Sequence, residues 1–146
     1  MPAARVATVN PVSDEAAPPR VAAVFADIKA IKKIAFVPNF WRVLAVSPDQ
    51  LELVWGRLKA VMHPEAVGRV SPLDALTREI IAVAVSATNG CAYCVNSHTA
   101  ALQKLGLTDE GIAEVLAVTS LFNSTNALAE GYQIESDVRP TIAGEG

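Results

Sequence analysis

Two cysteines, a histidine and a glutamate are the residues through which this sequence could perform chemistry. Cys91 and Cys94 are its only cysteines, and His98 follows them within a run of eight residues. Glu79 precedes Cys91 by twelve residues. In thiol redox catalysis a thiolate attacks, a second thiol closes a disulfide, and a base with its orienting acid moves the protons. These four residue types therefore predict a redox enzyme.

The spacing of these residues suits one face of a helix. Steps of three and four residues bring Cys91, Cys94 and His98 to the same side of a helix that begins near Cys91. A helix N-terminus stabilises an anion, which favours ionisation of Cys91, whereas a base four residues away favours Cys94. Asn89-Gly90 breaks the preceding helix and folds it back. We therefore expect Glu79 to face the cysteines, with His98 or a trapped water as its partner.

Four other interpretations of the cysteine pair stay open or are excluded by the sequence. A zinc site would need His98 and the distant His63, because there is no second CxxC motif. Covalent haem is excluded, since Val95 and not a histidine follows the second cysteine. The cysteines could also be buried and inert. A thioredoxin fold is not expected, because no strand pattern surrounds the motif.

Apolar residues recur at spacings of three and four along most of the chain, and no apolar–polar alternation indicates a strand. The fold class expected is all-α: a single-domain helical bundle of about six to seven helices, with the CxxC at the N-terminus of a central helix. The expected helices cover about 19–33, 39–46, 48–62, 72–88, 91–105, 108–118 and 121–134. An arm at 1–18, a helical domain at 19–138 and a tail at 139–146 complete the expected organisation.

Composition narrows the function classes. The net charge of −3 lacks the basic excess that a nucleic-acid-binding protein needs. No apolar run approaches the ~18 residues of a membrane span. Apolar residues make up 51% and charged residues 18%, which is more apolar than a typical soluble monomer and predicts a homo-oligomer. No signal-peptide pattern is visible, and a close cysteine pair suits a reducing compartment, so a cytoplasmic location is expected.

The residues resemble a known family. The resemblance is close over about 72–106 and rests on Thr77-Arg78-Glu79-Ile80-Ile81-Ala82-Val83-Ala84-Val85-Ser86, Asn89-Gly90-Cys91-Ala92-Tyr93-Cys94 and His98, with weaker support from residues 38–48. These segments resemble the alkylhydroperoxidase D-like proteins of the carboxymuconolactone decarboxylase superfamily. The resemblance implies an all-helical fold that assembles into dimers, trimers or hexamers.

The resemblance also implies roles for the site residues. Cys94 would attack the peroxide oxygen, and Cys91 would resolve the sulfenic acid and meet the external reductant. His98 and Glu79 would relay protons. Alkylhydroperoxidase D itself carries a second histidine between its cysteines, where this chain has Tyr93, and a phenol moves protons poorly at neutral pH. Tyr93 is then a candidate pocket residue.

The sequence leaves three candidate functions. The first is a CxxC-dependent peroxidase that reduces organic hydroperoxides with electrons from a dithiol or protein donor. The second is a thiol-disulfide oxidoreductase that acts on a protein or lipoyl partner and has little peroxidase activity. The third is a helical oligomer that binds a small ligand while the cysteines are idle or metal-bound. No cofactor is expected, because nothing in the sequence calls for haem, flavin or nicotinamide.

Overall fold

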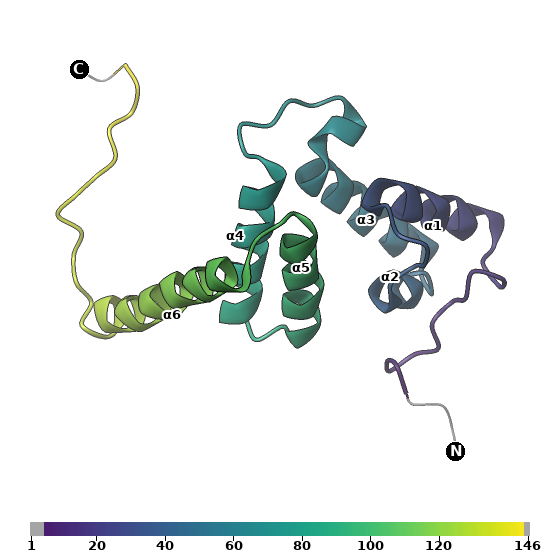
Figure 1. The fold of residues 1–146 in the computed structure, drawn as a ribbon, viewed down its shortest axis with the longest axis horizontal. Helices are drawn as coiled ribbons and strands as arrows, with labels where there is room; N and C mark the ends of the chain where they lie inside the picture. The colour runs from purple at the N-terminus through teal and green to yellow at the C-terminus, as the bar shows by residue number, and fades with distance from the viewer. Residues whose placement is uncertain (1–4, 145–146) are drawn as a thin grey trace. The chain divides into compact units, whose positions relative to one another are not determined.

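Helices make up all the regular structure of residues 5–144, the part of the chain that the computed structural model describes (Figure 1). They are α1 (Pro19–Lys32), α2 (Asn39–Leu44), α3 (Pro48–Met62), the short 3-10 helix η1 (Pro64–Val67), α4 (Ala75–Thr88), α5 (Ala92–Lys104) and α6 (Asp109–Gly131). This confirms the all-α class and the helix count. The helices group into two compact units that meet in sequence at residues 75 and 76, and each unit is described by itself.

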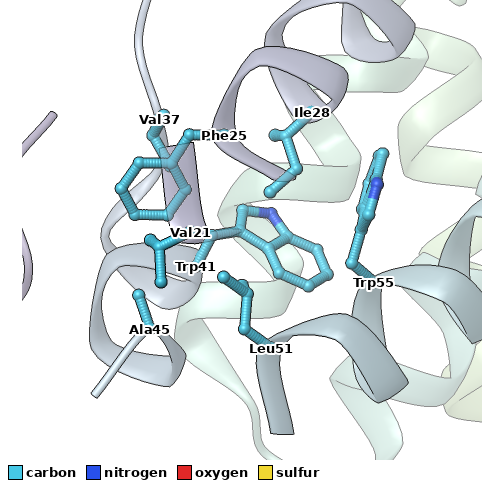
Figure 2. Close-up of a cluster of buried hydrophobic side chains, with 8 residues drawn as sticks. All are labelled: Val21, Phe25, Ile28, Val37, Trp41, Ala45, Leu51 and Trp55. Atoms are coloured by element: carbon cyan, nitrogen blue, oxygen red, sulfur yellow. The ribbon is translucent and has the colours of Figure 1, made fainter. Parts of the chain in front are cut away.

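The first unit packs α1, α2 and α3 around an aromatic core (Figure 2). The rings of Trp41 and Trp55 meet edge to face with centroids 5.2 Å apart, an arrangement that aromatic pairs favour. As the sequence predicts, Ser47 caps α3 by accepting a hydrogen bond from the Gln50 backbone, and Pro48 takes the first helical position. The buried core residues are Val21, Phe25, Ile28, Val37, Trp41, Ala45, Leu51 and Trp55.

Asp27 joins α1 to α3 at the edge of this core. Its carboxylate accepts hydrogen bonds from Trp55 Nε1 at 2.7 Å and from Lys59 Nζ at 2.8 Å. Burial raises the pKa of Asp27, but the hydrogen bonds from Lys59 and Trp55 and the charge of Lys59 outweigh it, so the pKa lies below its ordinary value. The ionised carboxylate is therefore the form that the folded unit stabilises.

The proline-rich N-terminal segment contacts α2 in its described part. The Val12 backbone donates to the Arg42 carbonyl at 2.9 Å, and Arg42 Nε donates to the Val12 carbonyl at 3.1 Å. Residues 1–4 of the expected arm and 145–146 of the expected tail lie outside the described residues. The boundaries of the arm, the 19–138 domain and the tail stay predictions.

The second unit consists of α4, α5 and α6, and α4 and α5 form an antiparallel hairpin (Figure 1). Gly90 turns the chain between them with φ +71°, in the left-handed region that glycine enters without a Cβ clash. Gly106 does the same after α5 with φ +91°. Thr108 then caps α6, its hydroxyl accepting a hydrogen bond from the Gly111 backbone at 3.2 Å. The breaks that the sequence predicts at these glycines are confirmed.

Two helix boundaries differ from the prediction. Helix α4 begins at Ala75 and not at Pro72, because the Ser71 hydroxyl accepts a hydrogen bond from the Leu73 backbone and holds a turn there. The two helices expected at 108–118 and 121–134 are one continuous helix, α6. No proline or glycine lies between Ile112 and Glu130, so the polar stretch from Phe122 to Asn126 does not interrupt the backbone hydrogen bonds.

Helix α4 is less enclosed than its sequence suggests. Val83 is fully buried, but Ile81 and Val85 remain about half exposed. Helix α6 contains no buried residue along its whole length. Apolar side chains on both helices are thus left without enough cover inside this unit.

Candidate active site

The CxxC motif lies at the start of α5, as predicted. Cys91 is the N-cap residue, Ala92 is the first helical residue, and Cys91 and Cys94 form a disulfide. The Cys91 sulfur also accepts a hydrogen bond from the Cys94 backbone N–H at 3.2 Å. This is the position and the bond that a serine or threonine cap would supply. The first cysteine is therefore tied both to its partner and to the first turn of the helix.

The backbone before the motif fixes where Cys91 sits. Gly90 supplies the left-handed turn, and the Cys91 backbone N–H donates to the carbonyl of Ser86 at 3.0 Å. Ser86 belongs to the last turns of α4, so this bond joins the two helices of the hairpin at the motif. The position of Cys91 thus follows from backbone contacts that do not involve its sulfur.

Glu79 and His98 meet across the same hairpin. Glu79 Oε2 lies 2.6 Å from His98 Nδ1, a short hydrogen bond between α4 and α5. The side chains are only 15% and 24% exposed, respectively. A carboxylate that binds one ring nitrogen fixes the orientation of the imidazole and leaves Nε2 as the nitrogen that can exchange a proton elsewhere.

The helix geometry relates His98 to the motif. His98 follows Cys94 by four residues on α5, so the two share a face of the helix. Side chains of an α-helix lean toward its N-terminus, which directs the imidazole over the turn that carries Cys94. The hairpin thus places an oriented imidazole one helical turn from Cys94, a spacing that suits a base beside a sulfur nucleophile.

The structure brings the four sequence-predicted site residues into one unit. Both cysteines, His98 and Glu79 are partly exposed. The candidate pocket residue, Tyr93, is 46% exposed on the first turn of α5. His63, which a zinc site would have needed, belongs to the other unit. Within residues 5–144 no group of three or more histidine, cysteine, aspartate or glutamate residues is placed to hold a metal ion.

Two features of this unit lie beyond the candidate site residues. The first is the carbonyl of Ser86, which accepts the hydrogen bond from the Cys91 backbone. Any residue type could supply this carbonyl, so the sequence does not reveal the contact. The second concerns the polar stretch of α6, where the Asn123 side chain accepts a hydrogen bond from the Thr88 hydroxyl at 3.1 Å. This bond ties α6 to the end of α4 beside a hollow of about 440 Å³. None of the four candidate residues lines that hollow.

Comparison with known proteins gives the family. Residues 58–134 match the carboxymuconolactone decarboxylase family, which is more than half of the chain. The chain belongs to this family. The matched range includes the whole α4–α5 hairpin and all four candidate residues. The resemblance of the sequence motifs to alkylhydroperoxidase D-like proteins is also confirmed.

Several relatives of this family member carry alkylhydroperoxidase names, and one is an uncharacterized protein. The crystal structure of the alkylhydroperoxidase AhpD core from Rhodospirillum rubrum superposes with a TM-score of 0.83 and 44% identity, covering 91% of this chain and 96% of that one. Alkyl hydroperoxide reductase AhpD of Streptomyces griseus is 33% identical over 80 residues, 55% of this chain and 45% of that protein. The uncharacterized protein YdfG of Bacillus subtilis is 38% identical over 55 residues, 38% of this chain and 37% of that protein.

The structural match covers much more of its partner than the two sequence matches do. The chain spans less than half the length of these two curated relatives, whereas it covers nearly all of the solved core. The solved core therefore shares the fold of this chain over nearly its whole length. None of the described helices is long and apolar enough to cross a membrane.

Proposed function

We propose that this protein is a peroxidase that reduces organic hydroperoxides through a dithiol–disulfide cycle of Cys91 and Cys94, with Glu79 and His98 as proton relay. The observation that carries the proposal is the 2.6 Å bond between Glu79 and His98, formed in the same helix hairpin as the Cys91–Cys94 disulfide. An oriented imidazole one helical turn from a thiol is an arrangement that serves proton transfer to and from sulfur.

The oxidising half of the cycle follows from these residues. His98, held by Glu79, takes the proton of Cys94, and the Cys94 thiolate attacks the terminal oxygen of the hydroperoxide. The O–O bond breaks, the alcohol leaves with a proton, and Cys94 becomes a sulfenic acid. The thiolate of Cys91 then attacks the Cys94 sulfur, a disulfide forms, and hydroxide leaves as water after taking a proton. Two thiols and one hydroperoxide thus give one disulfide, one alcohol and one water.

The reducing half of the cycle needs electrons from outside. A dithiol, small or on a protein, is the class of donor that thiol-disulfide exchange can use without a cofactor. Such a donor stays reduced in a reducing compartment, which agrees with the cytoplasmic location expected from the sequence. The alkyl hydroperoxide reductase names of several relatives support the same reaction class.

Turnover with defined reagents tests the proposal. Wild-type protein with cumene hydroperoxide and dihydrolipoamide should consume hydroperoxide catalytically, and the double variant Cys91→Ser, Cys94→Ser should not. Glu130→Gln, which alters an exposed carboxylate on α6, serves as the matched control and should retain full activity. Equal consumption by the wild-type protein and the double variant would contradict the proposal.

One observation favours a second function. Tyr93 and not a histidine stands between the cysteines, and it is about half exposed, so the motif has His98 as its one imidazole. A thiol-disulfide oxidoreductase acting on a protein or lipoyl partner needs less proton transfer to oxygen than a peroxidase does. It would exchange disulfides rapidly with lipoamide while consuming hydroperoxide no faster than free dithiol does. Measuring lipoamide exchange and hydroperoxide consumption on the same protein therefore separates the two functions.

A further inference from the structure

We propose that the electron donor attacks the sulfur of Cys94, and that Cys91 leaves as a thiolate held by the first turn of α5. The inference rests on the proposed dithiol–disulfide cycle and assigns the two sulfurs different parts in its reducing half. It departs from the family resemblance, in which Cys91 meets the reductant.

The first support is the hydrogen bond at the cap. Cys91 Sγ accepts from the Cys94 backbone N–H at 3.2 Å while it is still part of the disulfide. A thiolate is a far better acceptor than a disulfide sulfur, so the same bond becomes charge-assisted when the S–S bond breaks toward Cys91. The N-terminal dipole of α5 adds to this stabilisation, and no acidic residue lies in the first turn to oppose it.

The second support is that the cap does not depend on the disulfide. Gly90 with φ +71° and the bond from the Cys91 backbone N–H to the Ser86 carbonyl hold the N-cap residue in place through its backbone. Reduction breaks the S–S bond but leaves both of these backbone constraints in place. The Cys91 sulfur therefore stays within reach of the N–H group at the moment it becomes an anion.

The third support is the position of His98 relative to Cys94. His98, oriented by Glu79, follows Cys94 by one helical turn, so it can return a proton to Cys94 and restore its thiol. Both cysteines are partly exposed, which means that access alone does not select the sulfur that the donor attacks. The stability of the leaving thiolate then decides, because a better-stabilised thiolate leaves faster.

The reaction balances in two exchange steps. A donor thiolate attacks Cys94 Sγ, the S–S bond breaks, and its electron pair leaves on Cys91. The second thiolate of the donor attacks the donor sulfur of the mixed disulfide, which releases the oxidised donor and the Cys94 thiolate. His98 supplies the proton that Cys94 takes up. In the oxidising half, the Cys91 thiolate attacks the same Cys94 sulfur, so Cys94 is the electrophile in both halves of the cycle.

Trapping the first exchange on the wild-type protein tests the assignment. Oxidised protein is treated with glutathione, a monothiol whose first exchange gives the mixed disulfide, and is quenched with N-ethylmaleimide before a second glutathione can react. Tandem mass spectrometry of the tryptic peptide spanning both cysteines then locates each adduct. We expect glutathione on Cys94 and maleimide on Cys91. Glutathione on Cys91, or an even distribution, would overturn the assignment.

A charge next to the cap gives a second readout. Ala92→Asp places a carboxylate at the exposed first position of α5 and should slow reduction by glutathione several-fold, because it opposes the departing Cys91 thiolate. Ala100→Asp, exposed on the same helix two turns further along, is the matched control and should leave the rate unchanged. Equal rates in both variants would count against the assignment. Neither readout uses hydroperoxide, so failure of the peroxidase proposal leaves the test intact.

Discussion

At the scale of single residues, the proposed proton relay depends on the bond between Glu79 and His98. Both side chains are less than a quarter exposed, and the bond joins a carboxylate to one ring nitrogen at 2.6 Å. A base whose orientation is fixed loses less entropy when it acts, and a nearby carboxylate stabilises the imidazolium that forms. The pair thus links the carboxylate of α4 to the sulfur chemistry of α5.

Removing the charge of Glu79 should weaken this relay. Glu79→Gln keeps the shape of the side chain but supplies no anion to orient and stabilise His98. We expect the rate of disulfide formation with cumene hydroperoxide to fall roughly a hundred-fold, the lower end of what general acid–base catalysis contributes. Stopped-flow measurement of thiol loss checks this. An unchanged rate would remove Glu79 from the mechanism.

Part of the site's geometry is predictable from the sequence. The spacing of Glu79, Cys91, Cys94 and His98 was enough to predict that a helix hairpin would bring them together, because helical periodicity and a glycine turn determine that geometry. Two contacts could not be predicted from the sequence: the hydrogen bond that the Cys91 sulfur accepts at the cap, and the one that the Ser86 carbonyl accepts from the Cys91 backbone. Both depend on backbone positions within a turn, which no residue type specifies.

At the scale of elements, Gly90 sets the turn that presents the motif. Nothing lies within 4 Å of the position where a Cβ would be added, so only its backbone conformation, with φ +71°, resists substitution. Gly90→Ala should therefore destabilise the protein by about 1–2 kcal/mol, the cost of a left-handed L-residue. Gly56→Ala is the control, since Gly56 also has open space but lies inside helix α3.

The control should move stability in the opposite direction. Alanine in place of a helical glycine stabilises by about 0.5–1 kcal/mol. Urea unfolding of both variants gives the two free energies of unfolding. If Gly90→Ala proved as stabilising as Gly56→Ala, the turn would not have the left-handed backbone described here.

Asp27 should make the first unit sensitive to acid. The pKa of its carboxyl is lowered in the folded state, against the raising effect of burial, by hydrogen bonds from Lys59 and Trp55 and by the charge of Lys59. Its stabilisation is therefore complete above the ordinary carboxyl pKa of 3.8 and is lost as the pH falls through the lower folded-state value.

Asp27→Asn should lower stability at pH 7 by roughly 1 kcal/mol and flatten its decline in acid. Asp49→Asn, which changes a carboxylate 85% exposed in its pair with Arg20, should have little effect. Urea unfolding at pH 7 and at pH 3 checks both. A decline in acid as steep in Asp27→Asn as in the wild-type protein would show that Asp27 is not its source.

Element boundaries show where the sequence prediction failed and why. Caps and glycines located the start of α3, the turn between α4 and α5, and the start of α6 correctly. The break expected near residue 120 is absent, because polar side chains such as Asn123 and Ser124 do not disrupt a helix whose backbone bonds are intact. A local bond of Ser71 delayed the start of α4, which its Ser-Pro pattern alone did not reveal.

At the scale of the whole molecule, the exposed apolar side chains of α4 and α6 support the expected homo-oligomer. Helix α6 has no buried residue, and Leu121, Phe122 and Leu128 are each 56% exposed. A 23-residue helix with this much apolar surface favours a partner, and a second copy of the chain is the simplest one.

Sedimentation equilibrium should therefore give a mass that is a multiple of 15.4 kDa. Leu121→Glu, which puts a charge among these apolar residues, should shift the distribution toward the monomer. Ser120→Glu, an exposed polar position on the same helix, should not. A wild-type protein that sediments as a clean monomer would rule out the oligomer.

The proposed redox cycle is best tested by the intact mass and free-thiol content of the reduced wild-type protein, measured before and after one equivalent of cumene hydroperoxide. We expect rapid loss of both thiols and of about 2 Da, the two hydrogens removed when a disulfide forms. Peptide mapping should place that disulfide between Cys91 and Cys94. Two thiols that stay free and unreactive would contradict the redox function.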